Sequence, residues 1–286
     1  MKRSSLLLAT IALAFACAAP AAPARERVVC VSKQLNEFLF AIGAEDVLVA
    51  HDLTSVYPPR IRKLPSVGYH RALSAEGILS VKPTLLLTDG NVGPEAVLDQ
   101  VRSVGIPVVT MRAGAGPEGA ESLLTALGRR FHREARAAKV VADWRAGMQQ
   151  VYADSTKAPG PRPRVLMMHF GQIINNYLGV RSGSTGDRIL RWAGGVNAID
   201  SVGGMSRLTP ELIAKCAPEV ILATDVGFDR VGSAAKFAQL PGVALTPAAK
   251  SGRIYRIDET EIMYFGPRTP AAVRHIASLI HAKGGK

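Results

Sequence analysis

Short runs of apolar residues alternate along this chain with segments in which apolar residues recur every three or four positions. The runs predict strands and the periodic segments predict helices, and their alternation is typical of βαβ units with mainly parallel sheets. In the first half, strands are predicted over residues 28–32, 47–51, 85–88 and 108–111. Helices are predicted over residues 35–42, 74–80 and 94–104.

A proline-free segment rich in good helix formers follows, from Glu118 to Ala153. We predict one long helix here, about 50 Å long at 1.5 Å per residue, which ends at the proline-rich stretch 158–163. Beyond it, strands are predicted over residues 165–169, 220–223 and 253–257, and a last helix over residues 270–281.

This order of elements predicts an α/β fold of two Rossmann-like lobes joined by one long helix. We expect an N-terminal lobe at residues 25–117, a connecting helix at 118–158 and a C-terminal lobe at 159–286. A chain of 286 residues also exceeds the comfortable size of a single core. One connecting helix favours a clamp with limited hinge motion.

The two halves share a unit at an offset of 135 residues, which carries Leu73 to Leu208. Each unit has a helix-capping Ser or Thr, a short helix, a proline turn and an apolar strand. Glu76 and Glu211 occupy the same position in the two units. Chance similarity of two generic helix–proline–strand units is the alternative, and the matched glutamates argue against it.

The first 24 residues have the pattern of a secretory signal peptide. Basic residues at positions 2 and 3 precede an apolar stretch over 6–15, and small residues at 22 and 24 provide a cleavage site. The apolar stretch is too short to remain as a membrane span. Cys17 offers a lipid-anchored alternative, which the bulky Phe15 makes less favourable. We therefore expect an exported, soluble protein.

Basic residues outnumber acidic ones, with 35 Lys and Arg against 23 Asp and Glu and a formal net charge of +12. The excess favours an anionic partner. We exclude nucleic acid because the protein is expected to be exported and has no dense basic run or interleaved aromatic residues. Cys30 and Cys216 lie in apolar surroundings and are expected to be buried free thiols.

The sequence lacks the motifs that would indicate an enzyme. It contains no His-Glu-x-x-His, no Gly-x-Ser-x-Gly and no Walker loop. Residues 181–186 are rich in glycine and serine but lack the lysine and the spacing of a phosphate-binding loop. We do not expect catalysis.

Residues 68–77, Gly-Tyr-His-Arg-Ala-Leu-Ser-Ala-Glu-Gly, resemble the first-lobe signature of the haem-specific periplasmic binding proteins of ABC importers. Further stretches that agree with this group lie at residues 54–59, 192–197, 240–247 and 265–270. The resemblance covers essentially the whole chain after the leader. It implies the class III fold of periplasmic binding proteins, haem as the transported cargo and a periplasmic location.

The resemblance implies that Tyr69 is the axial ligand of the haem iron and that Arg71 supports it. A phenolate oxygen is a hard, anionic donor that suits ferric iron. A free tyrosine has a pKa of about 10, so ionisation needs help from the metal and from a nearby hydrogen-bond donor such as Arg71. The alternative is an ordinary loop tyrosine beside a solvated arginine.

Three further residues are candidates for contact with haem. His169 ends the first strand of the second lobe, and some members of the resembled group carry a second iron ligand in this region; a structural histidine is the alternative. His70 adjoins Tyr69 but should point away from it if the stretch is extended. Arg207 occupies the second-lobe counterpart of the Tyr69 loop and could bind a propionate or screen the phenolate; a solvated surface arginine is the alternative. Arg181 and Arg268 are weaker candidates of the same kind.

For Glu76 and Glu211, the resemblance implies docking onto arginines of the permease dimer. The alternative is that an acidic residue in a first helical turn only complements the helix dipole. The implied partners are an inner-membrane ABC permease dimer with its ATPase, and an outer-membrane haem receptor system upstream. A ferric siderophore or a corrinoid is the alternative cargo, although a siderophore already fills the coordination sphere of its iron and would not need Tyr69.

Overall fold

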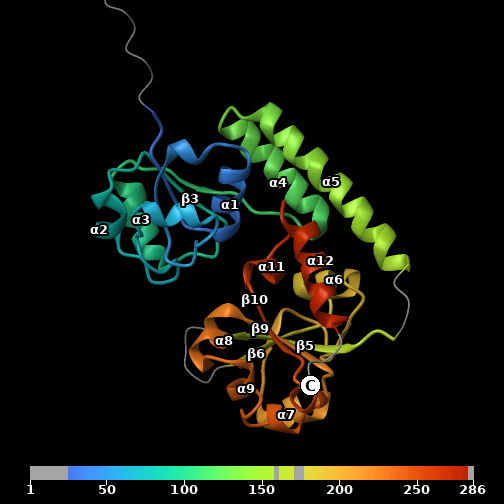
Figure 1. The fold of residues 1–286 in the computed structure, drawn as a ribbon. Helices are drawn as coiled ribbons and strands as arrows, with labels where there is room; N and C mark the ends of the chain where they lie inside the picture. Colours follow the sequence, from blue (N-terminus) through green and yellow to red (C-terminus); the bar gives the residue numbers. More distant parts are fainter. Residues whose placement is uncertain (1–24, 158–160, 171–176, 283–286) are drawn as a thin grey trace, which may run out of the picture.

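The structure is a computed structural model that describes residues 25–157, 161–170 and 177–282. The expected signal peptide, residues 1–24, lies outside the described residues. None of the described helices combines the length and the apolar character that a membrane span requires. Two α/β lobes lie one above the other in Figure 1, with a pair of helices along one side.

Four parallel strands form the sheet of the N-terminal lobe, in the order β2-β1-β3-β4. The strands are β1 (Val28–Cys30), β2 (Leu48–His51), β3 (Leu85–Thr88) and β4 (Val108–Thr110). The helices are α1 (Lys33–Ala41), α2 (Ala75–Ser80) and α3 (Glu95–Ser103), with short 3₁₀ helices at Glu45–Val47 and Pro59–Lys63. All seven elements predicted for this half are confirmed, within two residues at each end.

The sheet of the C-terminal lobe is mixed, with the order β10-β9-β5-β6-β8 and β7 beside β5. Its strands are β5 (Arg164–Phe170), β6 (Tyr177–Val180), β7 (Val196–Asn197), β8 (Met205–Arg207), β9 (Val220–Thr224) and β10 (Ile254–Ile257). The predicted strands β5, β9 and β10 are parallel. The apolar pattern did not reveal β6 and β8, and β6 runs antiparallel to both β5 and β8.

Helices of the C-terminal lobe cover its sheet and lead back toward the first lobe. They are α6 (Thr185–Trp192), α7 (Pro210–Cys216), α8 (Asp225–Val231), α9 (Ala234–Phe237), α10 (Pro247–Lys250), α11 (Thr260–Met263) and α12 (Thr269–Ile280), with a 3₁₀ turn at Val243–Leu245. The predicted last helix corresponds to α12. Figure 1 shows α11, α12 and α6 on the side that faces the first lobe, and α7 at the opposite end.

The prediction of one long connecting helix is wrong. The segment forms two helices, α4 (Gly116–Arg130) and α5 (Glu134–Lys157), which lie side by side (Figure 1). The chain reverses at His132, whose φ of 54° is left-handed. The helices pack so closely that a Cβ on Gly128 would lie 2.5 Å from the Cβ of Ala137. The apolar spacing concealed the turn because both helices bury their apolar residues in the same core.

The described residues form three buried apolar clusters. Each outer cluster fills the far face of one sheet. The central cluster is continuous across both lobes, since it joins Leu35 and Leu87 of the first lobe to Trp144 of α5 and Ile276 of α12. Cys30 and Cys216 are buried free thiols, as predicted.

The repeated unit is confirmed as two capped helices that each precede a buried strand. The Ser74 hydroxyl accepts a hydrogen bond of 3.0 Å from the Gly77 amide, and the Thr209 hydroxyl accepts one of 3.2 Å from the Leu212 amide. Pro210 occupies the first turn of α7. The helices α2 and α7 lie far apart on different lobes (Figure 1).

Candidate functional site

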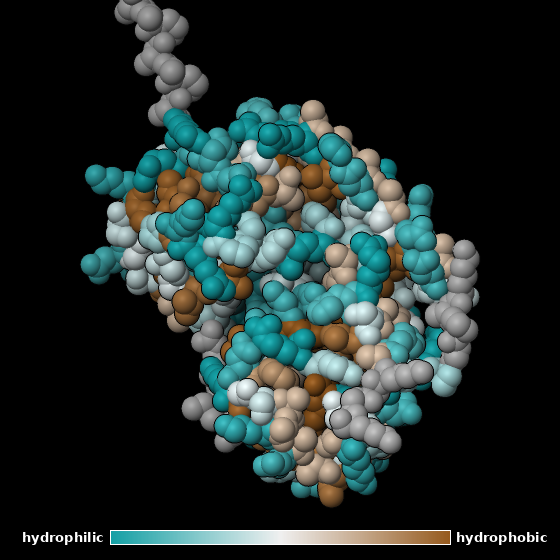
Figure 2. Space-filling model, in the orientation of Figure 1, coloured by the Kyte–Doolittle hydropathy of each residue, from teal (hydrophilic) through white to brown (hydrophobic). Residues whose placement is uncertain are grey.

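The carboxyl ends of the parallel strands in both sheets are directed at the space between the lobes. In the first lobe, the segments that follow β1, β2 and β3 line one cavity together with Met263 and Tyr264 of the second lobe. Parallel α/β sheets bind ligands at this edge. Figure 2 shows the hollow between the lobes, where hydrophilic surface predominates. The candidate site is therefore the interlobe cleft.

Two cavities meet in this cleft at Met263. The first has a volume of about 200 Å³ and contains His70, Asn91 and Lys33 in its wall. The second has a volume of about 500 Å³ and lies between the start of α4 and the β6, α6, β8 and α11 segments. Its wall combines apolar side chains with one cation: Val180, Met205, Ile262, Met263, Phe265 and Arg188. The cleft can thus accept a flat, largely apolar molecule with anionic groups.

The loop that carries Tyr69 is attached to the loops after β2 and β3. The Leu53 amide donates to the Gly68 carbonyl at 2.8 Å, and the Gly93 amide donates to the His70 carbonyl at 2.9 Å. Tyr69 itself is half-buried, and its hydroxyl has no hydrogen-bond partner among the described residues. The loop therefore presents this phenol from a backbone that is held on both sides.

His70 turns back against Tyr69 instead of away from it, so that expectation is wrong. The two rings pack edge to face with centroids 4.5 Å apart. The His70 Nδ1 lies 3.5 Å from Oδ2 of Asp52, whose side chain is fully buried. Burial raises the pKa of Asp52, but hydrogen bonds from His70, Ser55 and Thr54 outweigh it, and the pKa is lowered. Asp52 is therefore a buried carboxylate behind the imidazole.

Arg71 contacts Asn91 and not the Tyr69 oxygen in this structure. Its Nε and Nη2 donate to the Asn91 Oδ1 at 3.0 and 2.7 Å. The Asn91 Nδ2 lies 3.4 Å from the His70 Nε2. One amide side chain therefore holds both residues that follow Tyr69.

His169 lies at the cleft, and its Nδ1 already contacts residues of its own lobe. Its Nδ1 is 3.4 Å from the Thr224 hydroxyl and 3.5 Å from Oε2 of Glu259. Burial and the cation of Lys33 lower the pKa of His169, against the opposing effect of Glu259. Glu259 also forms an ion pair with Lys33 at the start of α1, which links the two lobes.

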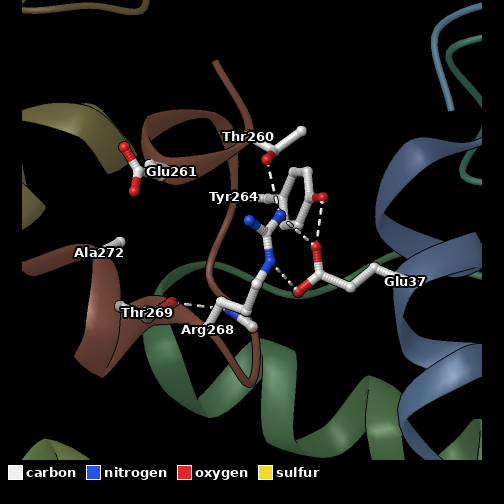
Figure 3. Close-up of a pocket in the computed structure, with 8 residues that line it drawn as sticks. Glu37, Thr260, Glu261, Tyr264, Arg268, Thr269 and Ala272 are labelled. Atoms are coloured by element: carbon white, nitrogen blue, oxygen red, sulfur yellow. Dashed lines mark hydrogen bonds and ion pairs between the residues drawn. The ribbon is translucent and has the colours of Figure 1, made fainter. Parts of the chain in front are cut away.

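Arg268 belongs to a second link between the lobes (Figure 3). Its Nε and Nη2 donate to the carboxylate of Glu37 in α1 at 3.1 and 2.7 Å, and the Tyr264 hydroxyl donates to the same carboxylate at 2.8 Å. Burial opposes the charge of Arg268, but Glu37 more than compensates and raises its pKa. This guanidinium also stacks 3.6 Å from the ring centroid of Tyr57. Arg268 therefore connects the lobes, and its guanidinium is paired with Glu37.

The remaining predicted residues line neither cavity, and among all the residues predicted from the sequence only His70 does. Arg207 is exposed on the edge strand β8, and Arg181 is held by the Ser201 hydroxyl at 3.1 Å. Glu76 and Glu211 are exposed in the first turns of α2 and α7. The pKa of Glu211 is lowered by its own backbone amide and by the Thr209 hydroxyl.

Sequence reasoning missed Asp52, Asn91, Lys33, Glu37 and Glu259, which make most of the polar contacts in and beside the cleft. The sequence did contain a signal for Asp52 and Asn91. Both follow a predicted parallel strand by one to three residues, where side chains meet at the sheet edge.

The model of the periplasmic binding protein family matches residues 28–261 of the chain. The chain belongs to this family. The family and the similar structures are binding proteins and not enzymes, which confirms that prediction. Binding proteins of this family work with an ABC permease and its ATPase.

This binding protein is similar over nearly its whole length to solved haem-binding structures. The periplasmic haem-binding protein RhuT from Roseiflexus sp. RS-1, in apo form, is 28% identical with a TM-score of 0.82, over 91% of this chain and 99% of that one. BhuT in complex with two haems is 30% identical with a TM-score of 0.79, over 89% and 99%. The resemblance and the class III fold inferred from the sequence are confirmed.

One similar protein is named for a different cargo. The vitamin B12-binding protein of Yersinia pestis is 38% identical over 87 residues, which are 30% of this chain and 31% of that protein. The chain thus matches about a third of the length of this relative. The same fold therefore serves corrinoid as well as haem binding proteins.

Proposed function

We propose that this protein binds haem in the interlobe cleft through Tyr69 and delivers it to an ABC importer. The observation that carries the proposal is the Tyr69 loop, which presents a phenol without a hydrogen-bond partner among the described residues at the edge where parallel strands end. A phenolate bound to ferric haem iron needs a fixed, accessible oxygen of this kind. The similarity to RhuT and BhuT supports haem as the cargo.

The cleft suits the two chemical halves of haem. Met205, Met263 and Phe265 offer apolar and polarisable surface to a flat macrocycle. Arg188 in the same wall, and Arg207 on the lobe edge, are cations for the propionates. The excess of basic residues over acidic ones across the chain agrees with an anionic cargo.

In this proposal, Arg71 and His169 act only once haem iron is bound at Tyr69. When iron binds Tyr69, Arg71 lies only two residues away and donates from Nη1 to the phenolate oxygen, while Nε and Nη2 stay on Asn91. His169 keeps Nε2 as the nitrogen for a sixth ligand, because Nδ1 is directed at Glu259, as in carboxylate–histidine–metal arrangements. Replacement of His169 by Ala then converts six-coordinate iron to five-coordinate iron.

Tyr69→Phe tests the proposal directly, because it keeps the ring and removes only the oxygen. Titration of the purified protein with haemin should give a high-spin ferric spectrum with a tyrosinate charge-transfer band. In Tyr69→Phe that band should vanish, and affinity should fall by more than the roughly 10–100-fold typical of outer-shell changes at metal sites. Tyr152→Phe, at an exposed tyrosine of α5, is the matched control. An unchanged spectrum in Tyr69→Phe rules out the assignment.

The second candidate cargo is a corrinoid, which the vitamin B12-binding relative favours. A corrinoid supplies its own cobalt ligands and leaves Tyr69 without a role. Calorimetric titration with cyanocobalamin separates the two cargoes. Tight binding of cyanocobalamin that Tyr69→Phe does not weaken, together with weak binding of haemin, would replace haem as the proposed cargo.

A further inference from the structure

Asp52, His70 and Asn91 form a continuous series of side chains that holds His70 and Arg71, the two residues that follow Tyr69. We propose that these three residues are positioning residues that hold the Tyr69 phenol in one orientation toward the iron. The inference rests on the proposed function and deepens it, because it names the groups that prepare the ligand before haem arrives. None of the three is offered as an iron ligand.

The series begins at a carboxylate that is sealed from solvent. The Asp52 side chain is 0% exposed and accepts hydrogen bonds from the Thr54 amide and from the Ser55 hydroxyl. Asn36 in α1 donates to the Ser55 hydroxyl at 2.9 Å and so supports the same group from behind. A buried carboxylate with this many donors holds its position, because losing any of them would leave a polar atom unpaired.

The imidazole of His70 is set by the partners of its two nitrogens. Nδ1 faces the carboxylate of Asp52, which can only accept, so Nδ1 carries the proton. Nε2 then accepts from the Asn91 Nδ2 at 3.4 Å. The side chain is 12% exposed, and both nitrogens are occupied, which leaves its ring face and edge as the surface that meets Tyr69.

Asn91 completes the arrangement by joining His70 to Arg71. Its backbone amide donates to Oδ1 of Asp89 at 2.8 Å, which anchors it at the end of β3. Its Oδ1 receives the guanidinium of Arg71. Because residues 70 and 71 are held from the loops after β2 and β3, the chain directly after Tyr69 is fixed, and the Tyr69 ring packs against an imidazole that is itself held.

The experiment compares His70→Ala, Asp52→Asn and Asn91→Ala with wild type in haemin titrations, haem dissociation rates and resonance Raman spectra of the iron–phenolate modes. Each variant should keep the tyrosinate signature but broaden its modes, and should bind haemin about 10–100-fold more weakly. His70→Ala with Asp52→Asn should lose no more affinity than His70→Ala alone, because both changes act through one ring. His281→Ala, which removes an imidazole bonded to the Ala193 carbonyl, should match wild type.

The outcomes separate this inference from the proposed function. If His70→Ala and Asn91→Ala bind haemin like wild type with unbroadened modes, the positioning role is wrong although Tyr69 still ligates iron. If wild type itself shows no tyrosinate signature, the proposed function fails. If His70→Ala abolishes ligation that Tyr69→Phe retains, His70 is the ligand and both ideas are wrong. Thermal unfolding checks each variant, and the exposed Asn91 tests the inference even if Asp52→Asn fails to fold.

Discussion

The Asp52 carboxylate is ionised because three side chains stabilise its charge more than burial opposes it. The folded-state pKa of Asp52 is consequently below its ordinary value of 3.8. A group of this kind contributes stability that is fully present above the unfolded pKa and is lost as pH falls through the folded pKa. In the haem-free protein, the stabilisation that the Asp52 carboxylate provides is therefore fully present above about pH 4.

Asp52→Asn should make stability less sensitive to acid. At pH 6 the variant should unfold at a lower urea concentration than wild type, since Asn cannot replace a charged acceptor. The difference between the two proteins should shrink as pH falls from 4 toward 2, because Asp52 becomes protonated in wild type. Urea unfolding of the haem-free proteins at several pH values measures it, and a gap that stays constant down to pH 2 contradicts the assignment.

At the residue scale, the sequence identified the ligand candidate but not its surroundings. Tyr69 and Arg71 stand in a contiguous motif, so a resemblance can locate them. Asp52 and Asn91 reach the same loop only because β2 and β3 end at one edge of the sheet. Such contacts depend on strand order, which apolar periodicity does not encode. The orientation of His70 was predicted wrongly for the same reason, since an extended strand was assumed where Asp52 turns the ring inward.

Among the elements, α1 provides the first-lobe side of the polar links described between the lobes. Lys33, Gln34 and Glu37 contact Glu259, the Phe265 carbonyl and Arg268 respectively. The spacing of 33 and 37 places these two side chains on one face of the helix. Figure 3 shows Glu37 extending from α1 to Arg268.

Arg268→Ala should destabilise the protein by about 3–5 kcal/mol, because it leaves the buried Glu37 carboxylate without its cation. Arg256→Ala is the matched control, since Arg256 and Asp229 form an exposed pair whose loss should cost no more than about 1 kcal/mol. Urea unfolding followed by circular dichroism compares them. Equal losses in the two variants would show that the Glu37–Arg268 link adds nothing beyond a surface ion pair.

The turn between α4 and α5 makes a separate prediction. His132 is exposed and adopts a left-handed conformation that costs most residues about 1–2 kcal/mol and costs glycine little. His132→Gly should therefore leave stability unchanged or raise it by up to about 1 kcal/mol, whereas His132→Ala should not raise it. Thermal unfolding of both variants tests this. A marked loss in His132→Gly would mean that the imidazole has a role in the turn.

For the whole molecule, the sequence predicted two lobes because the repeated unit and the alternating pattern are local properties. The strands β6 and β8 were missed because their sequences, Tyr-Leu-Gly-Val and Met-Ser-Arg, are not continuous apolar runs. The helix pair was merged into one helix because its turn contains neither proline nor a run of glycines. What periodicity could not show is that one apolar core runs through both lobes.

Docking by Glu76 and Glu211 is a prediction at this scale, because it requires both lobes at once. Glu76→Ala with Glu211→Ala should leave haemin affinity unchanged and abolish haem-dependent growth of cells that rely on the importer. Glu95→Ala with Glu118→Ala removes two other first-turn acids and serves as the control. Loss of growth in the control pair, or loss of haemin binding in the docking pair, contradicts the division of roles.

The continuous central core has a mechanical consequence for unloading. Packed apolar cores resist deformation and move between discrete arrangements. If the lobes were to separate, the packing within this cluster, which reaches from Leu35 to Trp144 and Ile276, would have to shear or break. An empty protein should therefore already have nearly the shape of a loaded one. Release of the cargo would then depend on the importer and on the ATP that it hydrolyses, and not on spontaneous separation of the lobes in the binding protein.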